Sequence, residues 1–375
     1  MIVPLQPSIL SIFDSMKRLL IILAAIAATV SLRAAETEFV FTDATTLKVC
    51  GKFCDDTFDE FSRIPVRYKG IFSKHIWDLG LNSTGVYIRF SSDSGTFRFT
   101  WTSTLGSNLD NMSLIGVRGL ALYVRDGKDW MYVGTARPSK KDNENNFTFS
   151  RDKLDGVSHE YMLYLSLYDG VKNLRIGVPE GKTVGQPALN LPDDERPVIL
   201  YGTSITQGAS ASHPGMSGGN QLSRLMDRSV VNMGFSGNGF LEPEMAEYLA
   251  SFPDPYAYVI DNWNGGPEIG RDHLETFLSI IRKAHPDTPI LLMGRAERPS
   301  SRYNTSDEND FKGKEAVMDE VCRKFRKAGD RKIHHICPTV LGRGNSSTID
   351  GSHFTDPAFT IWADDAYRTL KRICE

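Results

Sequence analysis

The strongest constraint on the fold is a change in the spacing of apolar residues at about residue 190. In residues 36–185, apolar and polar residues alternate within short segments such as "VYIRF", "TFRFTW" and "LALYVRD". This alternation is typical of half-buried β-strands, and clusters of Gly, Asn, Asp and Ser separate the segments. We therefore predict an antiparallel β-sandwich domain over residues 36–185, followed by a polar, proline-containing linker over residues 186–196.

From residue 197 to residue 375, short apolar segments alternate with helical patterns. Strands are predicted at "VILYG", "VVNMG", "YAYVID", "PILLMG" and "KIHHI". Helices are predicted at "PEMAEYLASF", "EIGRDHLETFLSIIRKA" and "DFKGKEAVMDEVCRKFRKA". A last helix is expected to have Asp356 as its N-cap and Pro357 at its first position. This order predicts a parallel sheet covered by helices on both faces, with ligands bound beyond the carboxyl ends of the strands.

The N-terminal segment has the layout of a secretory signal peptide. Lys17 and Arg18 precede an apolar run from Leu19 to Val30, which small residues follow. The run is too short for a comfortable membrane span, so we expect no membrane span after cleavage, and an uncleaved anchor is the alternative. We predict a signal peptide within residues 1–35, with Met16 as the start, and a secreted or periplasmic protein.

Charge and cysteine content exclude several classes of protein. The 46 acidic residues slightly outnumber the 43 basic residues, which argues against a nucleic-acid partner. Five scattered cysteines are no disulfide framework, although pairing of Cys50 with Cys54 stays open. Cys/His pairs with zinc-ligand spacing are absent from the sequence, and adjacent His334 and His335 on a strand point to opposite faces. We interpret these two histidines as structural.

The segment "VILYGTSITQG" places Ser204 just past the first strand of the predicted parallel sheet. A serine at this position is either a turn residue or a nucleophile. A nucleophile needs a base, a group that orients the base, and donors for the oxyanion. The rest of the chain must supply these groups.

A candidate base and its orienting group lie together in "STIDGSHFTDP", before the last helix. Gly351 allows the loop to fold back, so that the Asp350 carboxylate can meet the Nδ1–H of His353. This contact would leave Nε2 of His353 free to take the proton of a serine. The alternative is an ordinary turn with a solvated histidine.

Candidate oxyanion donors follow the second and third strands of the same half. Gly237 lies in "VVNMGFSGNGF", where glycines permit backbone N–H groups to face a ligand, and Asn264 in "VIDNWNGG" offers a side-chain amide. Each residue alone could be an ordinary loop residue. Their occurrence with Ser204, Asp350 and His353 at one predicted sheet edge favours a catalytic site.

Four segments, "GTSITQG", "NMGFSGNGF", "DNWNGG" and "DGSHF", resemble the four sequence blocks of the SGNH (GDSL-like) hydrolases. The resemblance implies a three-layer, flavodoxin-like α/β hydrolase domain behind the β-sandwich. It implies that Ser204 is the nucleophile and that Asp350 and His353 are the family's Asp–His pair. It also implies that Gly237, Asn264 and the Ser204 N–H form the oxyanion hole, with no metal or cofactor.

The resemblance extends less specifically to the first half and has two departures. The segment "HIWDLGLNSTGVYIRF" is similar to the N-terminal domain of a bacterial, carbohydrate-esterase-like branch of these enzymes. Thr203 stands where the family motif has Asp, and Gly265 where Asp usually follows the asparagine. Neither position carries the core chemistry, but both weaken any transfer of substrate preference.

These observations together predict a secreted serine esterase with an acyl-serine intermediate, acting on a small-molecule or polysaccharide ester. The specific expectation is O-deacetylation of acetylated saccharides. The alternatives are a lipid or short-acyl-ester hydrolase and a non-catalytic glycan-binding protein. Trp77, Trp101 and Trp130 could stack on sugar rings, but core positions are expected. The loop that starts at Arg295 could line the pocket, but a solvated loop is expected.

Overall fold

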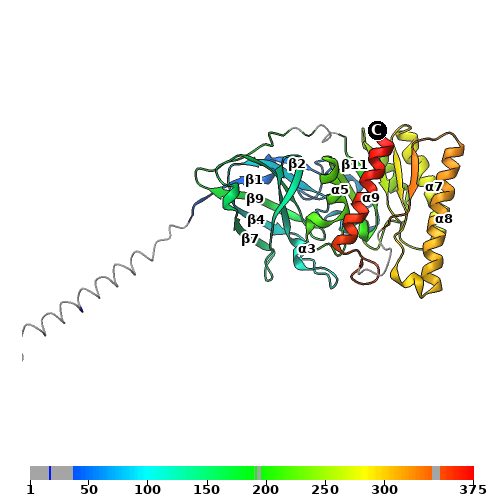
Figure 1. Ribbon diagram of the computed structural model, residues 1–375, viewed down its shortest axis with the longest axis horizontal. Coiled ribbons are helices and arrows are strands. Elements are labelled where there is room, and N and C mark those ends of the chain that lie inside the picture. Colours follow the sequence, from blue (N-terminus) through cyan, green and yellow to red (C-terminus); the bar gives the residue numbers. More distant parts are fainter. Residues whose placement is uncertain (1–16, 18–36, 190, 192–195, 340–346) are drawn as a thin grey trace, which may run out of the picture.

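The computed structural model describes Lys17 and residues 37–189, 191, 196–339 and 347–375 (Figure 1). Apart from Lys17, the predicted signal peptide lies outside the described residues, as does part of the predicted linker. Within the described ranges, no helix combines the length and the apolar character needed to cross a membrane. All five cysteines lie within these ranges and none forms a disulfide, so no disulfide joins Cys50 to Cys54.

The first half of the chain forms two antiparallel sheets that enclose a common core, at the left of Figure 1. The strands are β1 (Phe39–Asp43), β2 (Lys48–Cys50), β3 (Tyr87–Ser92), β4 (Thr96–Ser103), β5 (Leu120–Asp126), β6 (Asp129–Ala136), β7 (Glu144–Ser150), β8 (His159–Tyr164), β9 (Val171–Pro179) and β10 (Val184–Gly185). One sheet has the order β1-β9-β4-β7, and the other has the order β10-β3-β8-β5-β6 with β2 added to β3.

Alternation along the strands explains this sandwich. Every second residue of β4 is buried, so Phe97, Phe99 and Trp101 point into the core. There the ring of Phe97 contacts Phe90 of the facing sheet, at 6.0 Å between centroids. The predicted β-sandwich is confirmed. Two short helices that the alternation did not reveal, α2 (Lys74–Gly80) and α3 (Leu114–Arg118), interrupt it.

The second half of the chain forms a five-stranded parallel sheet. Its strands are β11 (Val198–Gly202), β12 (Val230–Gly234), β13 (Ala257–Ile260), β14 (Ile290–Met293) and β15 (Ile333–Ile336). Their order is β12-β11-β13-β14-β15, and all neighbours are parallel. This is the flavodoxin-like order, in which the direction of winding reverses between β11 and β13. The predicted three-layer α/β fold is confirmed, and this switch point is where ligands bind in such sheets.

Helices cover both faces of the parallel sheet. They are α4 (Ser204–Gln207), α5 (Gly218–Met226), α6 (Pro243–Ala250), α7 (Pro267–Ala284), α8 (Thr305–Lys327) and α9 (Asp356–Cys374). Ile199 and Tyr201 of β11 share a core with α6, α7 and α8, whereas Val198 and Leu200 share a core with α5 and α9. In Figure 1, α5 and α9 therefore lie between the β-sandwich and the sheet, and α7 and α8 lie at the far right.

The helix predictions need two corrections. The last helix begins at Asp356 and its N-cap is Thr355, so Asp356 is not the N-cap and Pro357 lies one position later than expected. Helix α5 was not predicted, because its sequence "GGNQLSRLM" opens with two glycines, which are poor helix formers. The packing of Leu222 against α9 and β11 stabilises this helix instead.

A buried arginine joins the β-sandwich to the parallel sheet. Arg63 is 1% exposed, and its guanidinium donates to the backbone carbonyls of Asn232 and Gly234 in β12, each at 2.9 Å. It also donates to the carbonyls of Leu79 at 2.7 Å and Asn82 at 3.2 Å. Burial lowers the pKa of Arg63 to about 9. A single side chain therefore satisfies carbonyls on both sides of the interface.

We expect Arg63→Met to destabilise the protein by at least about 3 kcal/mol, because buried carbonyls lose their donors while little apolar volume is lost. The matched control is Arg67→Met, which removes an exposed ion pair with Asp56 and should cost no more than about 1 kcal/mol. Urea unfolding followed by tryptophan fluorescence measures both variants. Equal losses in the two variants would show that Arg63 does not hold the interface.

Candidate active site

Ser204 lies at the carboxyl end of β11, as the first residue of the short helix α4. The turn that presents it is closely packed. A Cβ atom at Gly202 would lie 2.1 Å from Oγ1 of Thr206, so no side chain fits there. Gly208 ends α4 with φ of +99°, a left-handed conformation that favours glycine. The backbone on both sides of Ser204 is therefore fixed.

The structure brings Ser204, His353 and Asp350 together across 149 residues of sequence. Nε2 of His353 lies 2.9 Å from Oγ of Ser204, and Nδ1 lies 2.7 Å from Oδ2 of Asp350. Gly351 has φ of +85°, and it lets the loop between Asp350 and His353 fold back. A proton can therefore pass from the hydroxyl to an imidazole that a carboxylate orients.

Asp350 is held in its ionised form. Partial burial alone would raise its pKa, but hydrogen bonds from the backbone N–H and ring of His353, from Asn111 and from the Ser352 N–H outweigh this effect. The two backbone bonds are 2.8 Å and 3.0 Å long. The pKa of Asp350 therefore lies well below its usual value, and the carboxylate is charged at neutral pH.

Asn111 is a site residue that the sequence did not reveal. It lies between β4 and α3, in the β-sandwich half, and its Nδ2 is 3.2 Å from Oδ2 of Asp350 and 3.3 Å from Nδ1 of His353. No local pattern marks it, because the contact with Asp350 spans 239 residues. The β-sandwich thus contributes a donor to the Asp–His pair.

The predicted oxyanion donors lie on the pocket that Ser204 and His353 also line. Gly237 has φ of +67°, and its carbonyl accepts a 2.7 Å hydrogen bond from Nδ2 of Asn264. This bond fixes the amide of Asn264 beside Gly237 and leaves one amide hydrogen free. Within the described part of the chain, the N–H groups of Ser204 and Gly237 have no acceptor. Three donors can therefore face one oxygen.

Two sequence profiles of known families match this chain. The profile of the GDSL-like lipase/acylhydrolase family matches residues 195–371, and that of the N-terminus of SGNH-hydrolase-type esterases matches residues 39–184. Residues 195–371 belong to the GDSL-like lipase/acylhydrolase family. Both halves of this GDSL-like hydrolase thus have counterparts in SGNH-type esterases, as the sequence predicted.

Solved structures support the same assignment. A protein from Bacteroides ovatus, assigned as a GDSL-like lipase, is 28% identical, with a TM-score of 0.83 over 90% of this chain and 98% of its own. The salicylyl-acyltransferase SsfX3 of a tetracycline biosynthetic pathway is 17% identical, with a TM-score of 0.69 over 91% and 98%. A family two carbohydrate esterase from Cellvibrio japonicus is 13% identical, with a TM-score of 0.57 over 90% and 98%. The last two show the fold alone. No curated protein matches the sequence.

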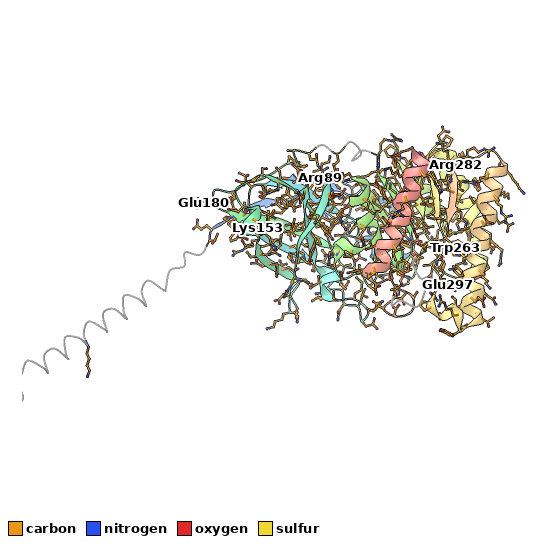
Figure 2. All side chains as sticks on the ribbon, viewed as in Figure 1. Arg89, Lys153, Glu180, Trp263, Arg282 and Glu297 are labelled. Carbon is orange, nitrogen blue, oxygen red and sulfur yellow. The ribbon has the colours of Figure 1, made fainter. Side chains whose placement is uncertain are left out.

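The pocket of this GDSL-like hydrolase has a volume of about 480 Å³ and is mostly polar. Arg295 is 8% exposed and lines the pocket, as does Arg298, so the expectation of a solvated loop is wrong. Figure 2 shows Trp263 and Glu297, which follow β13 and β14, below Arg282, which lies near the end of α7. Within the described residues, no cluster of three metal-ligating side chains occurs.

The three tryptophans considered for sugar stacking are interior residues. Trp77, Trp101 and Trp130 are 8%, 1% and 8% exposed. Each belongs to a hydrophobic core, which agrees with the expected core positions.

The contacts of His334 and His335 agree with a structural role. They contact Arg326 and Glu315 on neighbouring α8.

A buried carboxyl lies beneath the Ser204 turn. Asp261 follows β13, is 5% exposed, and accepts hydrogen bonds from Oγ1 of Thr206 at 2.6 Å and from the Asn262 N–H at 2.8 Å. Burial raises its pKa to about 6, although these two hydrogen bonds act in the opposite direction. Asp261 therefore links β13 to α4, and the free energy cost of burying its carboxyl group depends on pH.

The cost of burying the Asp261 carboxyl predicts that the stability difference between Asp261→Asn and the wild type depends on pH. The folded-state pKa of about 6 lies above the unfolded value of 3.8, so folding binds a proton, and the contribution of Asp261 to stability falls as pH rises between these values. Relative to the wild type, Asp261→Asn should gain up to about 3 kcal/mol between pH 4 and pH 7. Urea unfolding at both pH values measures the gain, with exposed Asp272→Asn as the control. A constant difference across pH would contradict this prediction.

The contact of Asn111 predicts a positioning role. Asn111→Ala should lower kcat for p-nitrophenyl acetate by about tenfold and change KM less than twofold, because the Asp350 carboxylate loses a donor and holds His353 less firmly. The pKa of Asp350, followed by carbon NMR, should rise toward its usual value. Exposed Asn146→Ala on β7 is the control. A change in stability alone, with kcat and the carboxyl titration unaltered, would exclude this role.

Proposed function

We propose that this chain is a serine esterase that hydrolyses its substrate through an acyl-Ser204 intermediate and that it removes O-acetyl groups from saccharides. The observation that carries the proposal is the 2.9 Å contact between Nε2 of His353 and Oγ of Ser204, backed by the 2.7 Å contact of His353 with Asp350. These are the distances that a general base and its nucleophile need.

In the proposed first step, the Oγ of Ser204 attacks the ester carbonyl carbon while its proton moves to Nε2 of His353. The carbonyl oxygen becomes an oxyanion, which the N–H groups of Ser204 and Gly237 and the amide of Asn264 stabilise. Removal of one such donor typically costs about 100- to 1000-fold in rate. The bond to the alcohol then breaks, and the alcohol leaves with the proton held by His353.

In the proposed second step, water gives a proton to His353 and attacks the acyl-Ser204 carbonyl. The same three donors hold the second oxyanion. On its collapse the bond between the acyl carbon and Oγ breaks, acetate is released, and Oγ of Ser204 takes the proton back from His353. The Asp350 carboxylate stabilises the imidazolium of His353 in both steps without accepting its proton. Apart from the ester and water, both steps use only groups that the chain provides.

Two features support an acetylated saccharide over a lipid. Ile205 and Trp263 are the large apolar residues among the lining residues of the described pocket, so a long acyl chain would find little apolar surface. In addition, a family two carbohydrate esterase shares the two-part fold. The predicted signal peptide stays a prediction, and secretion, which would give access to polysaccharides, is part of this proposal.

We expect Ser204→Ala to lose p-nitrophenyl acetate turnover by about 10⁴-fold or more, with an unchanged unfolding midpoint, because the nucleophile is gone. Acetyl esters should be preferred over octanoyl esters by the wild type. Initial rates measure both effects, with Ser279→Ala on α7 as the control. Full activity of Ser204→Ala would remove the nucleophile assignment, and a preference for octanoyl esters would favour a lipid hydrolase. Saccharide binding without turnover of any ester would favour a glycan-binding protein.

A further inference from the structure

Three cationic side chains line the same pocket as Ser204 and His353. Arg295 follows β14, Arg298 precedes the 3-10 helix η5 (Pro299–Arg302), and Lys314 lies on α8. Two of them therefore come from the loop between β14 and η5, and the fold brings Lys314 of α8 to the same place. Asp310 is the one acidic residue among the described residues that line the pocket.

The cations outnumber the carboxylate that faces them. Asp310 forms an ion pair with Arg295 and lies 4.0 Å from Nζ of Lys314. Asp307 also acts on Arg295. The guanidinium of Arg298, by contrast, has no hydrogen bond or ion pair with any described residue, although it is half-buried. A half-buried cation with no protein partner points to an anionic ligand.

The surroundings of Lys314 also indicate an excess of positive charge in the pocket. It is 3% exposed, and its ammonium donates to the carbonyl of Trp263 at 2.9 Å. Burial and the nearby charges of Arg295 and Arg298 lower the pKa of Lys314 to about 7. An anion in the pocket would relieve this repulsion, whereas an uncharged substrate would leave it uncompensated.

We propose that the pocket binds a carboxylate on the alcohol part of the substrate, and that the substrate is an O-acetylated saccharide with uronic acid residues. This inference rests on the proposed function, because an acetyl group is uncharged and leaves the sugar as the part that can carry the anion. Arg298 is the specificity-determining residue, since its planar guanidinium can bind a carboxylate through two parallel N–H donors.

The first experiment measures acetate release from O-acetylated galacturonan and from the same polymer after methyl esterification of its carboxylates. The wild type should show a kcat/KM about tenfold higher on the free acid, which corresponds to about 1.4 kcal/mol and is within what one charge-assisted contact can supply. Arg298→Gln should remove this preference by lowering kcat/KM on the free acid more than on the methyl-esterified polymer, and Arg298→Lys should retain part of it. Arg302→Gln removes a neighbouring charge outside the pocket and should behave as the wild type.

Equal kcat/KM on the two polymers, or an equal loss on both in Arg298→Gln, would overturn the proposal. Because Arg298 has no partner among the described residues, its replacement should leave the urea midpoint unchanged.

The second experiment measures binding alone and does not depend on turnover. The Ser204→Ala protein is titrated calorimetrically with galacturonate oligomers and with their methyl esters. The free acids should bind about tenfold more tightly, and Arg298→Gln introduced into Ser204→Ala should abolish the difference. Equal affinities would overturn the carboxylate site even if the protein is an esterase. If the wild type hydrolyses no ester but the free acids still bind more tightly than the methyl esters, the proposed function is overturned and the carboxylate site is not.

Discussion

The interface between the two halves of the chain depends on the buried guanidinium of Arg63. Its donors reach carbonyls at the end of β12, the strand that leads to Gly237, and carbonyls around α2 in the β-sandwich half. Because these carbonyls lie on both sides of the interface, separation of the two halves would remove the hydrogen bonds that Arg63 donates across it. On the other side of the site, Asn111 reaches Asp350 from the same β-sandwich half. The sandwich is therefore part of the frame that holds the site, rather than an independent module.

The reversal of winding between β11 and β13 explains why the reacting groups meet. Ser204 follows β11 and Asn264 follows β13, so both residues project from the crevice that this topology opens. Asp261 and Thr206 join the two strand ends beneath the crevice, and Gln207 accepts a hydrogen bond from the Ser236 N–H at 2.8 Å, beside Gly237. The backbone donors are thus set in place by the protein before any substrate binds, which is what electrostatic stabilisation of an oxyanion requires.

The sequence could predict those features that depend on local spacing. All five strands of the parallel sheet and the pairing of Asp350 with His353 follow from patterns within a few residues, and Ser204 could be found because a strand end marks it. Helix α5 was missed because its packing against α9, not its propensity, stabilises it. Asn111 was missed for a related reason, and the loop that contains Arg298 was considered for the pocket but expected to be solvated. Their positions near the site depend on loops whose paths are determined by tertiary contacts, and neither residue belongs to a periodic segment.

In the proposed reaction, the cations of the pocket and the carboxylate of Asp350 stabilise different charged groups. The cations that line the pocket favour the negative charge of the proposed substrate and of the oxyanion, but they repel the imidazolium that forms on His353. Asp350 offsets this repulsion only if it is ionised, and the four hydrogen bonds that keep its pKa low ensure that it is. Asn111 supplies one of these bonds from the β-sandwich half. A pocket selective for an anionic sugar therefore needs a firmly ionised aspartate behind its base, and the β-sandwich contributes to that ionisation.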